Sequence, residues 1–318
     1  MLKELTREEW IAITVGTDAY SIFIDPAFLE PVAAVFTNKL KYYIKFLKDV
    51  PVLGVACFTK GNKIIVPTHF IYSGIWWDID SNTIKFRNTL IDLIAELKGK
   101  YRSIEFRLPP EITDIRPFQW EGFSHKANFT YTRKTSDLNF EYNIRSRVKK
   151  SIAKGIVPSL SDSFKNVWHH QSYDLKRFHF SDRLLQKLGH LFESWLGSGF
   201  MYIYEADCEV DIVGSSCVLY DKKKSRAYNL LISSANSNYH TGVHAALYNY
   251  IFKHLQSEGI KEFDLYGADL RGVADFKSSF DAQLNVHYTV GYNRNLAFIN
   301  NIKQKVREKL VMVKSKIF

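Results

Sequence analysis

Cysteine is scarce in this sequence, with three residues among 318. Cys57, Cys208 and Cys217 stand in or near apolar, strand-like runs and lack the spacing of a metal site. Surroundings of this kind favour buried, reduced thiols. We therefore expect no disulfide framework and no cysteine-bound metal.

Long apolar runs are absent as well, because no hydrophobic stretch approaches the length of a bilayer span. The first residues, Met1-Leu2-Lys3-Glu4, lack the charged and then apolar pattern of a signal peptide. Hydrophobic residues make up 46% of the chain and charged residues 24%, as in globular proteins in general. The sequence therefore predicts a cytoplasmic protein.

Several catalytic motifs are missing from the chain. It contains no Gly-x-Ser-x-Gly elbow and no Walker loop, which argues against the hydrolase and NTPase classes. His240 and His244 are one helical turn apart, but neither the glutamate of an HExxH motif nor a third ligand accompanies them. We predict no metal site.

Acidic residues are absent between Tyr142 and Ser161, in a chain whose net charge is +10. This segment carries five basic residues instead, namely Arg145, Arg147, Lys149, Lys150 and Lys154. A second basic stretch, from Lys303 to Lys316, closes the chain. Such dense positive charge favours a polyanionic partner, either a nucleic acid or a phosphorylated ligand, and solvated helix faces are the alternative.

The length of the chain favours two domains, and hydrophobic periodicity predicts the element order α-β-β-β-α-β-α-β in each half. In the first half, we expect a helix over 26–36, strands over 41–47, 51–58 and 63–72, a helix over 83–98, a strand over 103–107, a short helix over 115–120 and a strand over 128–133. In the second half, we expect a helix over 181–195, strands over 200–207, 211–220 and 226–234, a helix over 239–257, a strand over 262–266, a short helix over 271–280 and a strand over 285–292. Lys60-Gly61-Asn62 is typical of a hairpin turn.

The segment from Glu262 to Asp281 has the character of a site. A short apolar strand stops at Tyr266-Gly267 and leads into a helix that bears Lys277. The glycine permits a backbone conformation that a side chain would resist. An ordinary connector with a solvated lysine is the alternative.

The element order resembles the acetyltransferase superfamily called GNAT, and its duplication resembles the Fem peptidoglycan-bridge aminoacyltransferases and their FemAB-like relatives. The basic segment from Arg145 to Gly155 is similar to the helix that connects the two domains in that family. Segments 263–267 and 272–280 are similar to its closing motif, in which a strand, a glycine and a Phe-Lys pair line the acyl-transfer channel. The Phe-Gly pair usual at the end of that motif is Phe280-Asp281 here.

The resemblance implies an α/β fold with a mixed, α+β-type sheet, built as two tandem GNAT-like (acyl-CoA N-acyltransferase) domains. The expected domains cover residues 1–140 and 161–295. A basic connecting helix and linker is expected over 141–160, and a basic C-terminal helix over 296–318.

The loop before the central helix of the second half departs from the pattern of acetyl-CoA users. In those proteins, glycines leave the backbone N–H groups of the loop exposed, and these groups bind the pyrophosphate. Here Gly242 is kept, but Tyr239 and His244 take the flanking positions. The long helical arm of many Fem enzymes is also missing, which brings the chain closer to the compact members of the family.

The resemblance implies an N-acyltransferase that moves an aminoacyl or small acyl group onto the amine of a cell-envelope precursor. The acceptor would be a sugar or a peptide, nucleotide-linked or phosphate-linked, and the donor substrate either acetyl-CoA or aminoacyl-tRNA. Two alternatives stay open. One is an acetyl-CoA-dependent amino-sugar N-acetyltransferase, and the other is a catalytically inactive GNAT-fold protein that binds RNA or another polyanion.

Two residues of the closing motif are candidates for catalysis. Acyl transfer to an amine builds negative charge on the carbonyl oxygen and releases a proton from nitrogen. Lys277 would stabilise the oxyanion or a donor phosphate, and Asp264 would accept the proton. A structural ion pair between Asp264 and Arg271 or Lys277 is the alternative.

Candidate binding residues fall into three groups. Guanidinium and ammonium groups that suit an acceptor phosphate come from Arg145, Arg147 and Lys150. Aromatic residues Tyr72 and Trp76 would form a sugar or base platform, with core packing as the alternative, and Tyr266, Arg271 and Phe276 complete the acceptor site. Donor-binding candidates are Ser234, Asn236 and Gly242, although the run from Ser233 to Asn238 also suits a helix N-cap.

The sequence leaves the partners open beyond the acceptor. tRNA binding and a peripheral membrane contact through the basic face are both compatible with the charge pattern. The oligomeric state is not predicted.

Overall fold

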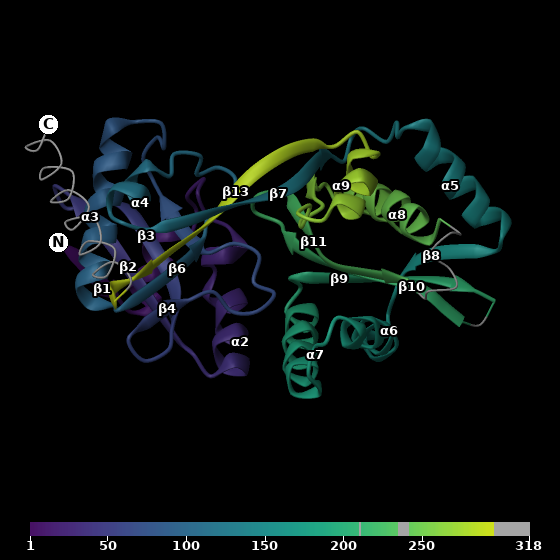
Figure 1. Ribbon diagram of the computed structural model, residues 1–318, viewed down its shortest axis with the longest axis horizontal. Coiled ribbons are helices and arrows are strands. Elements are labelled where there is room, and N and C mark those ends of the chain that lie inside the picture. The colour runs from purple at the N-terminus through teal and green to yellow at the C-terminus, as the bar shows by residue number, and fades with distance from the viewer. Residues whose placement is uncertain (210, 235–241, 296–318) are drawn as a thin grey trace, which may run out of the picture. The chain divides into compact units, whose positions relative to one another are not determined.

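The computed structural model describes residues 1–209, 211–234 and 242–295 (Figure 1). The chain divides into two compact units, each described by itself below. Unit 1 comprises Met1–Ile13, Lys39–Ala127 and the segment from Tyr288, whereas unit 2 comprises Thr14–Asn38 and Asn128–His287.

The sheet of unit 1 has the strand order β1-β2-β3-β4-β6-β13, with β5 beside β3. Its strands are β1 (Leu2–Leu5), β2 (Lys39–Leu47), β3 (Val50–Thr59), β4 (Lys63–Ile65), β5 (Gly74–Trp77), β6 (Ser103–Arg107) and β13 (Gln283–Asn293). Strands β2, β3 and β4 are antiparallel, while β6 lies parallel to β4. The helices are α1 (Arg7–Thr14), α3 (Ile84–Lys100) and α4 (Arg116–Trp120).

The core of unit 1 lies between this sheet and α3. Buried residues follow α3 at helical spacing, namely Phe86, Leu90, Leu93, Ile94 and Leu97. The side-chain hydroxyl of Thr83 caps the start of the helix by accepting a hydrogen bond from the Phe86 backbone N–H at 3.2 Å. The helix predicted over 83–98 is therefore confirmed.

The sheet of unit 2 has the strand order β7-β12-β11-β10-β9-β8. Its strands are β7 (Ser124–Lys134), β8 (Ile156–Leu160), β9 (Met201–Cys208), β10 (Asp211–Asp221), β11 (Arg226–Ser234) and β12 (Glu262–Asp264). Strand β12 is parallel to β11, and the two pair only from Arg226 to Tyr228 on β11. Strand β12 ends at Asp264, whereas β11 continues to Ser234, so the later part of β11 has no hydrogen bonds to β12.

Helices cover both faces of the unit 2 sheet (Figure 1). They are α5 (Tyr142–Ala153), α6 (Phe164–Arg177), α7 (Asp182–Gly197), α8 (Val243–Ser257) and α9 (Arg271–Ser278). Helices α6 and α7 lie on one face, and α8 and α9 on the other. A core of α8 residues and strand residues, including Leu247, Ile251, Phe252 and Phe263, holds these layers together.

An N-terminal segment also belongs to unit 2. Helices η1 (Ile22–Ile24) and α2 (Pro26–Phe36) lie in it. The ring of Phe28 stacks on Trp195 of α7 with a centroid distance of 4.5 Å, and Trp195 Nε1 donates a hydrogen bond to the Phe28 carbonyl at 2.9 Å. This helix thus packs in unit 2, although the predicted domain 1–140 contains its sequence, and the predicted boundaries remain a proposal.

The predicted α/β fold class and tandem element order are confirmed, and the last strand of each half has an unforeseen partner. Strand β7 ends the first half of the chain but pairs with β12 in unit 2 over Thr132–Lys134. Strand β13 ends the second half but pairs with β6 in unit 1 over Thr289–Asn293. Each unit is therefore completed by a strand from the other half of the sequence.

The prediction of one strand over 63–72 is wrong. Strand β4 ends at Ile65, and Pro67, which has no N–H for a ladder, follows it. A separate strand, β5, forms afterwards and pairs with β3. The hairpin turn at residues 60–62 is confirmed by the antiparallel pairing of β3 with β4.

Two further expectations concern the membrane and the C-terminal helix. None of the helices within the described ranges is long and apolar enough to cross a bilayer. The basic helix predicted over 296–318 lies outside the described residues.

Candidate functional site

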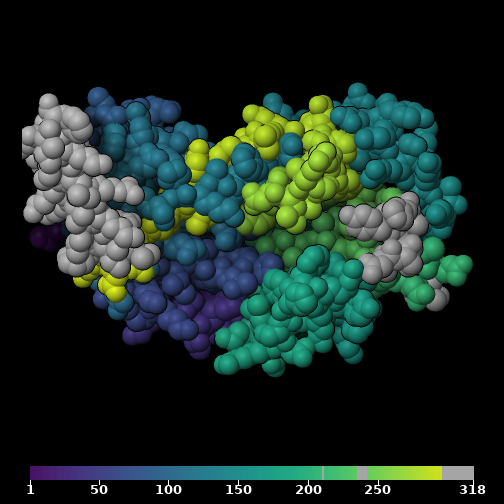
Figure 2. Space-filling view, in the orientation of Figure 1, coloured from purple at the N-terminus to yellow at the C-terminus, as the bar shows by residue number. Residues whose placement is uncertain are grey.

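A pocket of about 570 Å³ lies in unit 2 between β11 and four helices. Residues from α5, α6, α8 and α9 line it together with Ile232, among them Asn143, Arg147, Asp174, Gly242, His244, Tyr248, Val273, Asp275, Phe276 and Lys277. Phe178, which ends α6, also lines it. In the space-filling view, α5 and α9 both reach the surface of unit 2 (Figure 2).

Helix α8 begins at the pocket in close contact with α5. Gly242 is its N-cap residue, with φ of 85° in the left-handed region. A Cβ atom at this position would lie 2.6 Å from the carbonyl oxygen of Arg147. Only glycine fits both the backbone conformation and the close approach of the two helices.

The ammonium group of Lys277 is held by the turn that follows β12. Its Nζ donates hydrogen bonds to the carbonyl oxygens of Leu265 at 2.6 Å and Gly267 at 2.8 Å, and also to that of Tyr266. The residue is 5% exposed, and burial lowers its pKa to about 8, although the carboxylates of Asp264 and Asp269 oppose this shift. Three acceptors occupy the three ammonium hydrogens, so a direct bond to an oxyanion would require one of these bonds to break.

Asp264 holds the same turn from the other side. Its Oδ1 accepts hydrogen bonds from Thr130 Oγ1 at 2.5 Å and from the backbone N–H of Tyr266 at 2.9 Å. The side chain is buried, and Asp264 is not part of the described pocket lining. This geometry favours the structural alternative for Asp264 over proton transfer.

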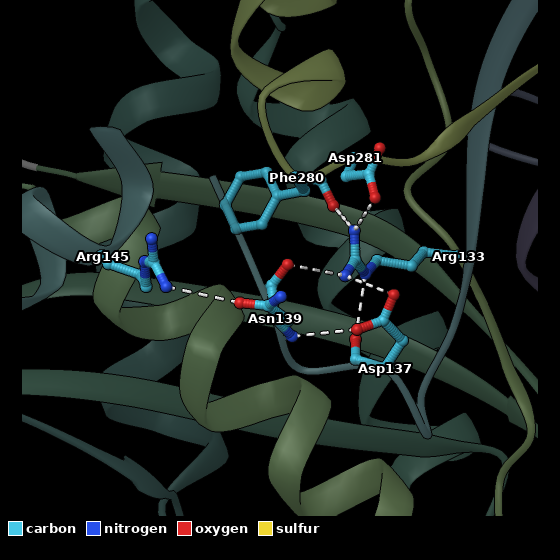
Figure 3. Close-up of polar contacts among 6 residues, drawn as sticks. All are labelled: Arg133, Asp137, Asn139, Arg145, Phe280 and Asp281. Atoms are coloured by element: carbon cyan, nitrogen blue, oxygen red, sulfur yellow. Dashed lines mark hydrogen bonds and ion pairs between the residues drawn. The ribbon is translucent and has the colours of Figure 1, made fainter. Parts of the chain in front are cut away.

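Two walls of the pocket are connected through the buried guanidinium of Arg133, on β7 (Figure 3). Its Nε donates to the Asp137 carbonyl at 3.0 Å, its Nη2 lies 3.1 Å from Asp137 Oδ2, and its Nη1 donates to the Phe280 carbonyl. Asn139, in the same linker, accepts a hydrogen bond from Arg145 at 3.4 Å. The buried guanidinium of Arg133 therefore binds both the segment before α5 and the segment after α9.

The inner wall of the pocket is aromatic. Tyr248 is fully buried, and its ring packs on Phe276 and Phe280 with centroid distances of 6.0 Å and 5.2 Å. His244, one turn earlier on α8, has its pKa lowered to about 4, chiefly by burial. The imidazole is therefore neutral at pH 7, and this wall carries no charge besides Lys277.

A polar cluster anchors α6 to the sheet. His170 Nδ1 lies 2.8 Å from Ser215 Oγ and 3.0 Å from Ser233 Oγ, and both serines are buried. Burial lowers the pKa of His170. Because Asp174 and Phe178 follow His170 at intervals of one helical turn, this anchor fixes the part of α6 that faces the pocket.

Charged groups of both signs line the pocket nearer the surface. Arg147 is exposed, and no ion pair is described for its guanidinium. Asp174 forms an ion pair with Arg177 at 3.1 Å, and Asp275 forms a long one with Arg271 at 3.7 Å. The pocket therefore offers a cation and two carboxylates to the same bound molecule.

The structure brings four of the predicted site residues into this lining, namely Arg147, Gly242, Phe276 and Lys277. The other candidates in unit 2 are not in the described lining. The side chains of Arg145, Lys150 and Arg271 are exposed. Tyr266 is half-buried, and its ring packs on His287. The Ser234 hydroxyl is buried without a hydrogen-bond partner among the described residues, and Asn236 lies outside those residues.

The predicted aromatic platform is buried in unit 1. Tyr72 and Trp76 are each 1% exposed, and Trp76 belongs to β5. A side chain with so little accessible surface offers no face to a ligand. The position of both rings fits the core-packing alternative.

Sequence reasoning missed Asp174, Phe178, His244 and Tyr248 as parts of the pocket. Asp174 and Phe178 escaped because no helix was predicted over 164–177. The helical spacing of His170, Asp174 and Phe178 was the available signal. The aromatic residue on α8 is indistinguishable from core in the sequence.

The family model of the acetyltransferase (GNAT) domain matches residues 133–278. The match spans somewhat less than half of the chain. The matched residues include every pocket residue named above and both candidate catalytic residues. Among curated proteins, none matches the sequence.

Solved structures extend the likeness over both units. FemX has a TM-score of 0.63 at 13% identity, covering 91% of this chain and 96% of its own. The C-terminal domain of a lysylphosphatidylglycerol synthetase from Agrobacterium fabrum has a TM-score of 0.58 at 12% identity, covering 94% and 96%. A tandem GNAT protein from the clavulanic acid biosynthesis pathway has a TM-score of 0.54 at 7% identity, covering 92% and 99%.

At these identities the likeness concerns the fold. The chain has the tandem GNAT fold, as its resemblance to FemAB-like proteins predicts, and residues 133–278 match the model of an acetyltransferase (GNAT) domain. The pocket of unit 2 is the candidate site of that domain.

Proposed function

We propose that this protein is an N-acyltransferase that transfers an aminoacyl or small acyl group to the amine of a cell-envelope precursor. The acceptor is a sugar or peptide that carries a nucleotide or phosphate. The observation that carries this proposal is the pocket of the GNAT domain, which combines one exposed arginine with two carboxylates.

Arg147 is the proposed phosphate-binding residue. A guanidinium binds phosphate through a planar fork of N–H donors. No described carboxylate pairs with Arg147, so its donors are available to a ligand. Further positive charge comes from Lys150 of α5 and from Lys154, its C-cap residue. Such a field favours an anionic acceptor.

Asp275 is the proposed proton acceptor, in place of Asp264. In the reaction the acceptor nitrogen attacks the acyl carbon, and a C–N bond forms as the bond to the donor's oxygen or sulfur breaks. The nitrogen loses a proton to the carboxylate, and the leaving group takes up a proton. Asp275 lines the pocket and its ion pair is long and exposed, so this carboxylate is accessible to an amine.

The name of one structural neighbour supports an aminoacyl donor. It is a lysylphosphatidylglycerol synthetase, whose name indicates that a lysyl group is joined to phosphatidylglycerol. The start of α8 supports the same choice. A pyrophosphate bound there would need open N–H groups, but the Arg147 carbonyl lies against Gly242 and presents partial negative charge.

Acetyl-CoA remains the second candidate donor. A fungal glucosamine N-acetyltransferase region shares the fold, with a TM-score of 0.51 at 11% identity, covering 92% of this chain and 38% of that chain. This neighbour favours an amino-sugar acceptor. Binding of RNA or another polyanion without catalysis is the outcome if no acyl transfer is detected.

The test compares two arginines on the same helix in the full chain. Arg147→Gln removes a pocket cation, whereas Arg145→Gln removes an exposed one that does not line the pocket. With nucleotide-linked amino sugars and peptides as acceptors, we expect Arg147→Gln to raise the acceptor KM roughly tenfold, as for loss of a charge-assisted hydrogen bond, and Arg145→Gln to change it little. Equal effects of the two variants would contradict the assignment of the pocket.

Donor identity is tested in the same assay. Aminoacyl-tRNA and acetyl-CoA are supplied separately, and product is detected by mass spectrometry. Transfer from aminoacyl-tRNA alone supports the proposal, and transfer from acetyl-CoA alone selects the second candidate. Absence of transfer from both, with saturable RNA binding, would overturn the assignment as an enzyme.

A further inference from the structure

We propose that Arg133 and Asp281 form a clamp that fixes the spacing between α5 and α9, and that Arg133 is thereby a positioning residue for the acceptor. The part concerning the acceptor rests on the proposed function. The clamp itself is tested independently below.

The guanidinium of Arg133 is committed to groups on both sides of the pocket (Figure 3). Its side chain is 3% exposed, and it lies over the Phe140 ring with 5.0 Å between the guanidinium carbon and the ring centroid. Toward α5 it binds Asp137 and the Asn139 carbonyl, and toward α9 it binds the Phe280 carbonyl and Asp281. Rupture of either set would leave part of a buried charge unsatisfied.

Asp281 occupies an unusual backbone position beside the clamp. Its φ is 55°, in the left-handed region where glycine is unstrained. The aspartate brings a carboxylate within 3.7 Å of Arg133 Nη1. Aspartate fits this left-handed position less well than glycine would, but its carboxylate adds negative charge beside Arg133.

The clamp reaches the pocket through short paths. Phe280 directly follows Ser279, which lines the pocket together with Phe276 and Lys277 of α9. On the other side, Asp137 and Asn139 lie just before α5, which bears the pocket residues Asn143 and Arg147. Arg147 and Phe276 thus sit on two walls whose separation depends on one cation.

Arg133→Met tests the clamp, because it keeps the length of the side chain and removes the charge. Arg226→Met is the matched control, because Arg226 forms a partly exposed ion pair with Glu262 at 2.8 Å elsewhere in unit 2. Hydrogen exchange of the full chain, measured without substrate, tests whether Arg133 holds the two segments together. The KM for the acceptor and kcat test whether Arg133 positions the acceptor.

We expect Arg133→Met to accelerate exchange over 137–150 and 279–283 selectively, and to raise the acceptor KM about tenfold with little change in kcat, since small misplacements of binding groups are costly. The KM effects of Arg133→Met and Arg147→Gln should be less than additive. Arg226→Met should change neither exchange in these segments nor KM.

Exchange that rises uniformly over unit 2 would overturn the clamp, and selective exchange with an unchanged KM would overturn the positioning role. If the chain transfers no acyl group, the exchange result still decides the clamp. Should Arg133→Met not fold, Asp281→Asn provides the milder variant, because it keeps a residue that tolerates the left-handed region and removes only the charge.

Discussion

Lys277, a candidate catalytic residue from the sequence, uses its ammonium group to bind backbone carbonyl groups. The carbonyl groups of three consecutive residues, Leu265, Tyr266 and Gly267, converge on its ammonium group. Asp264 accepts the Tyr266 N–H of the same turn. The two side chains therefore fix the backbone between β12 and α9, and their effect on chemistry passes through the shape of that turn.

We predict that Lys277→Met lowers the free energy of unfolding by about 2 kcal/mol or more, because three buried carbonyl groups lose their donor. Lys253→Met, at an exposed position of α8, should change it by less than about 0.5 kcal/mol. Urea denaturation of the full chain measures both. Equal stability of Lys277→Met and the unmodified chain would contradict a structural role for the ammonium group.

The same lysine predicts a pH dependence. Its pKa is about 8 in the folded protein and 10.5 in its ordinary state. Between these values the unfolded chain holds a proton that the folded chain has lost, so this group makes stability rise as the pH increases from 8 toward 10.5 and leaves it flat below 8. The difference in unfolding free energy between the unmodified chain and Lys277→Met should follow this curve. A flat difference from pH 7 to 10 would contradict the lowered pKa.

At the scale of elements, the contact between α5 and α8 shapes the site. Gly242 begins α8 in the left-handed region, directly against the Arg147 carbonyl. The contact places a pocket arginine beside the start of a helix. One glycine therefore sets how closely α5 and α8 pack at the pocket.

Two glycines that flank α8 allow the effect of this contact to be measured. Gly242 and Gly259 both have positive φ, but no described atom lies within 4 Å of a Cβ built on Gly259. We predict that Gly259→Ala costs about 1 kcal/mol of stability through backbone strain, and that Gly242→Ala costs about 3 kcal/mol because strain and collision add. Thermal unfolding measures the difference. Equal losses would mean that α5 yields to the new methyl group.

At the scale of the whole molecule, sequence order and packing diverge. The helix α2 packs on α7 in unit 2, and the final strand of each half completes the sheet of the other unit. The two units are consequently assembled from interleaved segments of the chain. Loss of one segment therefore acts on a unit far from it in sequence.

Phe28→Ala tests this interleaving. Phe28 is fully buried and stacks on Trp195, so its truncation should cost about 3–5 kcal/mol. We predict faster hydrogen exchange in α7 and no change in α3, whereas Leu93→Ala, in the core of unit 1, should do the reverse. Faster exchange in α3 after Phe28→Ala would support the contiguous domain 1–140 instead.

Local patterns were sufficient for much of the fold and for part of the site. Helix α2 and strand β6 match their predicted bounds, because periodic apolar residues, caps and turn residues act within a few positions. Arg147, Gly242, Phe276 and Lys277 were found through the family motifs and do meet at one pocket. Tyr72, Trp76 and Asp264 are buried outside the described lining, which the sequence did not indicate because residue type does not reveal which way a side chain points.

The sequence by itself determined most of the elements, their order in two halves and the concentration of positive charge on α5, since each depends on neighbouring residues. Only the tertiary structure decided which strands pair, which unit α2 joins, and that Lys277 and Arg133 are held by backbone carbonyls. Strand partners and buried cations depend on groups brought together from distant positions. Similar strands compete for the same partners until the folded chain selects among them by total burial and hydrogen bonding.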